Sequence, residues 1–215
     1  MPSTEVLLER LTLLPLLILS LTVHEWAHAW SAWRLGDDTA NGQGRMTLNP
    51  LVHIDLLGTI VLPLLSPIPF GWAKPVPVDP ARFRRTVSMS GGMALTASAG
   101  PLANLLLALV AAVAIGLGFR FLPGELQNSP VLMLLVQMLR LNVALAVFNM
   151  LPVPPLDGSR IVAWLVPPSM TDTWRQVESF APLFLIAVLL WGSRLAAGPI
   201  SAVYRQLENL IYLIA

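Results

Sequence analysis

Two histidines and a glutamate lie close together in the pentapeptide HEWAH, residues 24–28. Histidines four residues apart on an α-helix stand one turn above each other on one face, so His24 and His28 could bind a single metal ion. Glu25 adjoins them, where a carboxylate can take a proton from water that the ion activates. The alternative is a pair of satisfied interior histidines. We favour a zinc site, because the pentapeptide lies in an apolar segment and the chain has only three histidines.

A third metal ligand is expected elsewhere, because a hydrolytic zinc site usually has three protein ligands and keeps one position for water. The chain has no cysteine, which leaves histidine, aspartate and glutamate. Asp157 is the strongest candidate, since it lies in NMLPVPPLDGSR, residues 149–160, where prolines stiffen the chain and Gly158 allows close backbone approach. The alternative is that Asp157 caps a following short helix, and residue chemistry alone leaves both interpretations open.

The composition indicates that these residues lie in a lipid bilayer. The chain of 215 residues is 55% hydrophobic and 12% charged, with a mean hydropathy of +0.70, which is too apolar for an ordinary soluble domain. Residues 86–119 contain no charged side chain, and this stretch is longer than the roughly 20 residues that cross a bilayer as a helix. A net charge of +1 without a basic stripe or a reading motif argues against nucleic acid as a partner.

The hydropathy pattern predicts an all-α polytopic membrane protein with about four transmembrane helices and an amphipathic C-terminal helix. The transmembrane helices are expected at residues 4–35, 90–121, 130–151 and 179–197. One face of the C-terminal helix would carry Ile200, Val203, Leu207, Leu210 and Ile214. We expect this helix either to lie on the membrane or to return across it.

Residues 37–85 are rich in glycine and proline and do not resemble an ordinary span. The apolar piece at residues 56–70 is too short and too rich in proline to cross a bilayer, which predicts a re-entrant or surface-lying segment. Irregular backbone at membrane depth needs protein or a watery cavity around it, so this segment is expected to line a site. The stretch GWAKPVPVD, residues 71–79, is therefore of interest.

The distribution of lysine and arginine predicts the orientation of the chain. If the first helix exits into the cytoplasm, most of the basic residues near span ends fall on the cytoplasmic side. The turn from His24 to His28 and the Asp157 segment then lie at the same depth, near that side.

Three motifs together resemble the site-2 protease family of intramembrane zinc metalloproteases. They are HEWAH in a hydrophobic helix, SAGPLANL at residues 98–105, and NMLPVPPLDG at residues 149–158. The resemblance covers the core, residues 20–160, of what we expect to be a single membrane-embedded domain over residues 1–215. The resemblance is to the compact bacterial type of the family, so we expect no appended soluble domain. The stretch GWAKPVPV also looks like the membrane-associated strand region of that branch, and could hold an unwound substrate by strand pairing.

The resemblance implies that His24, His28 and Asp157 bind one Zn²⁺ and that Glu25 is the general base. The implied activity is hydrolysis of peptide bonds in or near transmembrane segments of membrane-protein substrates, in the bilayer of a bacterial inner or plasma membrane. A zinc or cation transporter is one alternative, although the ionisable residues concentrate at one depth rather than along several spans. A catalytically silent recruiter of membrane proteins is another, and the intact set of base and ligands disfavours it.

Four further polar residues have weaker predictions. Asn149 could donate a hydrogen bond to a bound peptide or to a developing oxyanion, and a helix-packing hydrogen bond is the alternative. For Asn104 we favour packing over a role in the site. For His53 a hydrogen bond within its loop is the simpler interpretation, and the role of Arg140 is open. The sequence does not specify the physiological substrate or the oligomeric state.

Overall fold

The computed structural model describes residues 3–66, 71–124 and 129–215. Its elements in chain order are α1 (Thr4–Leu35), α2 (Thr39–Gly42), η1 (Pro50–Val52), η2 (Leu56–Val61), α3 (Leu62–Leu65), η3 (Pro80–Arg82), α4 (Met89–Phe121), α5 (Pro130–Asn149), α6 (Asp157–Leu165), η5 (Pro168–Met170), α7 (Thr171–Ser179) and α8 (Ala181–Ile214). No strand occurs within these described ranges. The prediction of an all-α fold is confirmed.

Three helices, α1, α4 and α5, are long and apolar enough to cross a membrane. A fourth span is added if the bent pair Pro168–Ser179 and Ala181–Gly192, which meets at 65°, is counted as one. By length and composition this agrees with the expected number of about four. The described residues thus form a polytopic helical membrane protein.

The first helix has the bounds that the sequence predicts, Thr4–Leu35, and its caps explain them. The Ser3 hydroxyl accepts a hydrogen bond from the Val6 N–H at the start. Gly36 ends the helix at φ 113°, a left-handed conformation that glycine adopts without the usual Cβ penalty. The Arg84 N–H donates to Leu35 O at 2.8 Å, so this helix end is tied to the chain that leads into α4.

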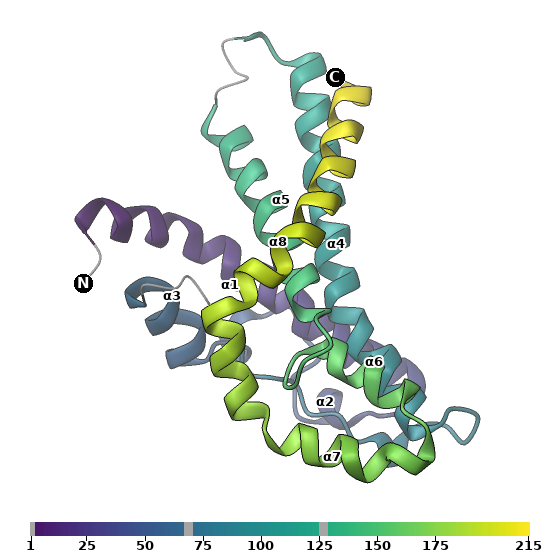
Figure 1. The fold of residues 1–215 in the computed structure, drawn as a ribbon. Coiled ribbons are helices and arrows are strands. Elements are labelled where there is room, and N and C mark those ends of the chain that lie inside the picture. Colours follow the sequence, from purple (N-terminus) through teal and green to yellow (C-terminus); the bar gives the residue numbers. More distant parts are fainter. Residues whose placement is uncertain (1–2, 67–70, 125–128) are drawn as a thin grey trace.

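Helix α4 is the centre of the fold and packs against α1, α5, α6 and α8 (Figure 1). Its buried face is built largely from small residues, which let neighbouring helix backbones approach closely. These residues are Gly92, Ala94, Ala97, Gly100, Ala108, Ala111, Ala112 and Gly116. Towards the C-terminal end of α4, its alanines form an apolar core with α5 and with the last turns of α8.

The C-terminal half of α8 belongs to the helix bundle. Figure 1 shows it running beside α4 and α5 to the C-terminus. Ile200, Val203 and Leu207 from the predicted apolar face pack against the core, and Ile214 approaches Gly116. The amphipathic pattern therefore reflects packing against other helices, and the helix expected to end at residue 197 continues to Ile214.

The segment before α4 is mostly irregular. Its apolar piece forms a π-helical turn, η2, that continues into the short α3, and residues 67–70 of the predicted re-entrant piece lie outside the described residues. Residues 71–79 contain neither helix nor strand, which corrects the expectation of a strand there. The physical reason is that Pro75 and Pro77 have no N–H to donate to a ladder.

Candidate metal centre

The cluster is built from one face of α1 and the first residue of α6. His24 and His28 are both buried and stand one turn apart in α1. After α5 the proline-rich turn leads to Asp157 at the start of α6. At Gly158 a Cβ would meet Leu151 O at 2.5 Å, so α6 can start this close to the end of α5 only because glycine stands there.

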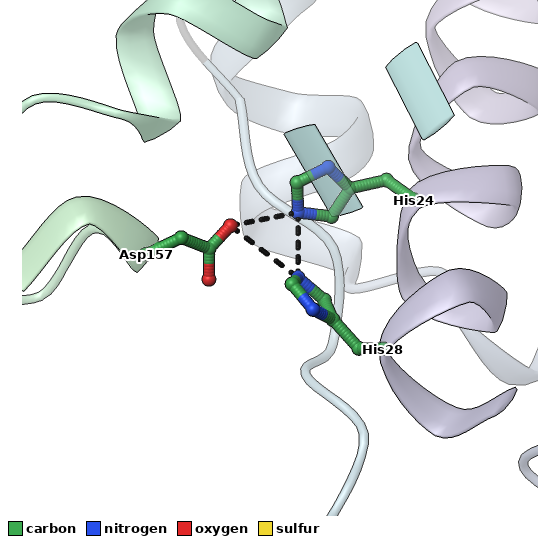
Figure 2. A group of neighbouring side chains, drawn as sticks. All are labelled: His24, His28 and Asp157. Carbon is green, nitrogen blue, oxygen red and sulfur yellow. Dashed lines mark hydrogen bonds and ion pairs between the residues drawn. The ribbon is translucent and has the colours of Figure 1, made fainter. Parts of the chain in front are cut away.

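The three predicted ligand residues converge, as Figure 2 shows. Asp157 Oδ2 lies 3.2 Å from His24 Nε2 and 3.3 Å from His28 Nε2. The two Nε2 atoms are 2.9 Å apart. Four ligands at about 2.0–2.1 Å around a tetrahedral ion would be separated by about 3.3–3.4 Å. The cluster has nearly the dimensions that a zinc ion requires.

The hydrogen bonds behind the imidazoles determine where their protons are. His24 Nδ1 lies 2.7 Å from Asn104 Oδ1, and His28 Nδ1 lies 2.7 Å from the backbone oxygen of Thr96. Both oxygens only accept, so both Nδ1 atoms carry the hydrogen and donate it. In neutral rings the two Nε2 lone pairs then face the carboxylate oxygen of Asp157 with no proton between them. This arrangement fits a bound cation.

Asp157 does not cap its helix. Leu156 occupies the N-cap position, and no side-chain capping bond forms there. The carboxylate instead faces the two imidazoles.

Glu25 is buried beside the cluster, on the turn of α1 between the two histidines. Its Oε2 accepts a hydrogen bond of 2.9 Å from the Val76 N–H, in the irregular stretch 71–79. The same stretch is fixed by a bond of 2.8 Å from the Lys74 N–H to His53 O and by one of 2.7 Å from the Asp79 N–H to Asp37 Oδ2. The stretch therefore lies against the centre, as the sequence led us to expect.

Gly100 of α4 closes the other side of the cluster. A Cβ at this position would lie 2.5 Å from His28 Nε2 and 2.6 Å from His24 Nε2. The absence of a side chain is what allows α4 to approach the imidazoles. Gly100 belongs to SAGPLANL, which explains how this motif contributes to the centre.

The weaker sequence predictions have mixed outcomes. The Asn149 amide donates to Leu145 O in its own helix at 3.0 Å, so its proposed contact with a substrate stays a prediction. His53 Nε2 donates to Thr47 O at 2.9 Å, as expected for a loop role. Arg140 Nε contacts the Tyr204 hydroxyl at 3.5 Å.

Asn104 is the residue that sequence reasoning underrated. It is fully buried and contacts His24, whereas the sequence favoured a packing role. The sequence did contain an indication that Asn104 lies near the site, because Asn104 follows Gly100 by four residues and so shares its helix face. Asn142, which bonds to Asn104, was not identified as a site residue at all.

The fold and this cluster define a polytopic membrane protein with a candidate metal centre built between helices. Residues 118–190 match the model of Peptidase family M50, a range that includes Asp157 and excludes the two histidines. No solved structure matches the chain.

Several bacterial proteins are similar to the chain. One from Bacillus subtilis (strain 168), named "Putative zinc metalloprotease YwhC", is 40% identical over 179 residues, which cover 81% of this chain and 77% of that protein. Rip2 of Mycobacterium tuberculosis (strain H37Rv), with the same description, is 29% identical over 80% of this chain and 64% of its own length. The chain belongs to peptidase family M50, the site-2 protease family, which confirms the resemblance found in the sequence.

Proposed function

We propose that the chain is an intramembrane zinc metalloprotease in which His24, His28 and Asp157 hold one Zn²⁺ and Glu25 is the general base. The observation that carries these roles is the convergence of two Nε2 lone pairs and a carboxylate oxygen, with both Nδ1 hydrogens donated away from the centre. Membership of a peptidase family and the names of the relatives support zinc and proteolysis.

When bound, zinc supplies the Lewis acidity that activates water and polarises a peptide carbonyl. Glu25 accepts the proton of the attacking water and returns it to the nitrogen of the leaving amine. The Val76 N–H holds one carboxylate oxygen of Glu25, which leaves the other oxygen for this proton. Asn104 and the Thr96 carbonyl hold the two imidazoles with Nε2 directed at the centre.

The proposed substrates are transmembrane segments of membrane proteins, reached within the bilayer. A helical substrate hides its peptide carbonyls in backbone hydrogen bonds, so cleavage requires local unwinding. Residues 71–79 lie beside Glu25 and are the candidate surface for the opened segment. Because Pro75 and Pro77 offer no N–H, this surface would bind substrate mainly by accepting hydrogen bonds at its carbonyls.

We further propose that the centre opens toward the cytoplasm of a bacterial cell. Basic residues gather at the end of α1 nearest the cluster and before α4, and basic residues near span ends favour the cytoplasmic side. They are Arg34, Arg82, Arg84 and Arg85. The chain would act as one membrane-embedded domain over residues 1–215.

The test compares the wild type with Glu25→Gln, each reconstituted in liposomes with a panel of single-span membrane peptides, and determines the zinc content of both. Glutamine keeps the size of the side chain but cannot act as a base. We expect about one zinc in each protein and cleavage by the wild type alone, since a general base contributes about 10²–10⁴ in rate. Equal cleavage by both would remove Glu25 from the mechanism. Zinc transport into the liposomes without cleavage would favour a transporter.

A further inference from the structure

A network of hydrogen bonds between buried polar side chains connects the candidate metal centre to the middle of the helix bundle. Asn104 of α4, Asn142 of α5 and Ser20 of α1 are all fully buried. Asn104 Nδ2 donates to Asn142 Oδ1 at 2.8 Å and to Ser20 O at 3.3 Å. Asn142 Nδ2 donates to Ser20 Oγ at 2.9 Å and to Met138 O at 2.9 Å. This network joins α1, α4 and α5, the three helices that are long and apolar enough to cross a membrane.

The direction of each hydrogen bond in this network follows from the two groups that lie farthest from His24, the Ser20 hydroxyl and the Met138 carbonyl. The Ser20 hydroxyl donates its only hydrogen to Leu16 O at 2.8 Å, so it can only accept from Asn142. Met138 O is a carbonyl and also only accepts. Both hydrogens of the Asn142 amide are therefore used on these two groups. Its Oδ1 must face Asn104.

The same reasoning fixes the amide of Asn104. Its Nδ2 hydrogens point to Asn142 Oδ1 and Ser20 O, which leaves Oδ1 directed at His24. A reversed Asn104 amide would set a donor against the Nδ1 hydrogen of His24 and leave two buried acceptors facing its oxygen. Leaving such buried polar groups unsatisfied costs about 1–3 kcal/mol for each group. The reversed arrangement is excluded by the network rather than by Asn104 alone.

We propose that Asn142 is a positioning residue for the metal centre. It acts through Asn104, whose amide it orients so that His24 keeps its hydrogen on Nδ1 and presents the Nε2 lone pair to the ion. Asn142 itself contacts neither the ion nor a substrate. This inference rests on the proposed zinc site and adds a structural cause for the orientation of one of its ligands.

The experiment measures the zinc affinity of the detergent-solubilised full chain by competition with a chelator. Asn142→Leu keeps the approximate size of the side chain and removes its amide. We expect zinc affinity to fall by about tenfold, the lower range for loss of a partner behind a metal ligand. Ser20→Ala removes one of the two acceptors that orient Asn142 with little change in volume, and should lower affinity in the same direction by a smaller factor.

Thr22→Val is the matched control. Thr22 is buried in the same helix, two residues before His24, but its hydroxyl bonds only to Ile18 O of that helix. Its replacement should change zinc affinity by less than about twofold. A fall as large as that of Asn142→Leu would mean that any buried polar residue near the centre has this effect, which would overturn the specific role of Asn142.

A double-mutant cycle separates orientation of the Asn104 amide from general structure. If Asn142 acts through Asn104, Asn142→Leu should lower zinc affinity about tenfold in the wild type and change it by less than about twofold once Asn104 is replaced by alanine. If the two substitutions lower affinity independently, or if Ser20→Ala and Asn142→Leu both keep full affinity, the proposal is wrong. Wild-type protein that folds but binds no zinc would instead contradict the proposed function.

Discussion

Glu25 and Val76, 51 positions apart in the chain, are joined by a hydrogen bond of 2.9 Å from the Val76 N–H to Glu25 Oε2. Val76 stands between Pro75 and Pro77, so it supplies the only backbone N–H of that tripeptide. The proline before it and the proline after it both restrict the local backbone to extended conformations. A stiff piece of loop thus presents a single donor to the proposed base.

Replacing Val76 by proline tests this relationship. Val76→Pro keeps an extended backbone but removes the hydrogen that Glu25 accepts. A hydrogen bond to a charged group contributes about 1.5–3 kcal/mol, so kcat/KM for a membrane peptide should fall by roughly ten- to hundredfold. Zinc content should be unchanged, because Val76 contacts none of the three proposed ligands through this bond.

Val78→Pro is the matched control for that experiment. Val78 is half-buried like Val76 and lies in the same stretch, but its N–H makes no hydrogen bond among those found in the described residues. The kcat/KM of the Val78→Pro variant should stay within about twofold of the wild-type value. Equal losses in the two variants would show that loop stiffness, and not the bond to Glu25, is what matters.

Gly100→Ala should disrupt the metal centre. The added methyl group would lie 2.5 Å from His28 Nε2 and 2.6 Å from His24 Nε2, so the imidazoles or α4 must move. Overpacking of this kind costs about 1–3 kcal/mol, which corresponds to roughly a ten- to hundredfold loss of zinc affinity if the imidazoles move. Chelator competition measures the loss directly.

The control for Gly100→Ala is the same substitution at Gly198, in α8. A Cβ there would meet no atom within 4 Å apart from the adjoining residues and backbone of its own helix. Alanine is the better helix former by about 0.8–1 kcal/mol, so Gly198→Ala should leave zinc affinity unchanged and stability equal or higher. Wild-type zinc affinity in Gly100→Ala would mean that α4 does not approach the imidazoles as described.

Asp37 is expected to stabilise the loop that reaches Glu25. Its carboxylate is almost fully buried and accepts hydrogen bonds from the Thr39 N–H, the Thr39 hydroxyl and the Asp79 N–H. Asp37→Asn replaces one acceptor by a donor, which should lower the free energy of unfolding in detergent by about 1.5–3 kcal/mol. Asp172→Asn is the control, because that side chain is 91% exposed and its ion pair with Arg175 is worth little. Equal stability of the two variants would contradict this role.

The sequence predicted those parts of the centre that depend on local spacing. HEWAH in an apolar run is sufficient to put His24 and His28 on one face of a helix, and Gly36 marks the end of α1. The prolines after Asn149 likewise mark the end of α5, two residues earlier than predicted. The pairing of Asp157 with the histidines needed three motifs considered together, because its alternative role as a helix cap uses the same residue type.

The parts that were missed depend on how helices pack. Asn142 lies in a largely apolar helix that also carries Gln137 and Arg140, and only the register of α5 against α4 brings it to Asn104. The acceptor for His28 is the backbone oxygen of Thr96, which no side-chain pattern can indicate. The expected strand at residues 71–79 was wrong because two prolines in that stretch remove the donors of a ladder. The tail of α8 was ambiguous, since an apolar helix face suits a membrane surface and a helix bundle equally.

Zinc-edge X-ray absorption of the purified wild type and of Asp157→Ala tests the central claim most directly. We predict one zinc per wild-type chain with two imidazole nitrogens and oxygen ligands at about 2.0–2.2 Å, and weaker zinc binding with both imidazoles retained in the variant. A folded wild-type protein without zinc, or with zinc bound by fewer than two imidazoles, would contradict the site described for His24, His28 and Asp157.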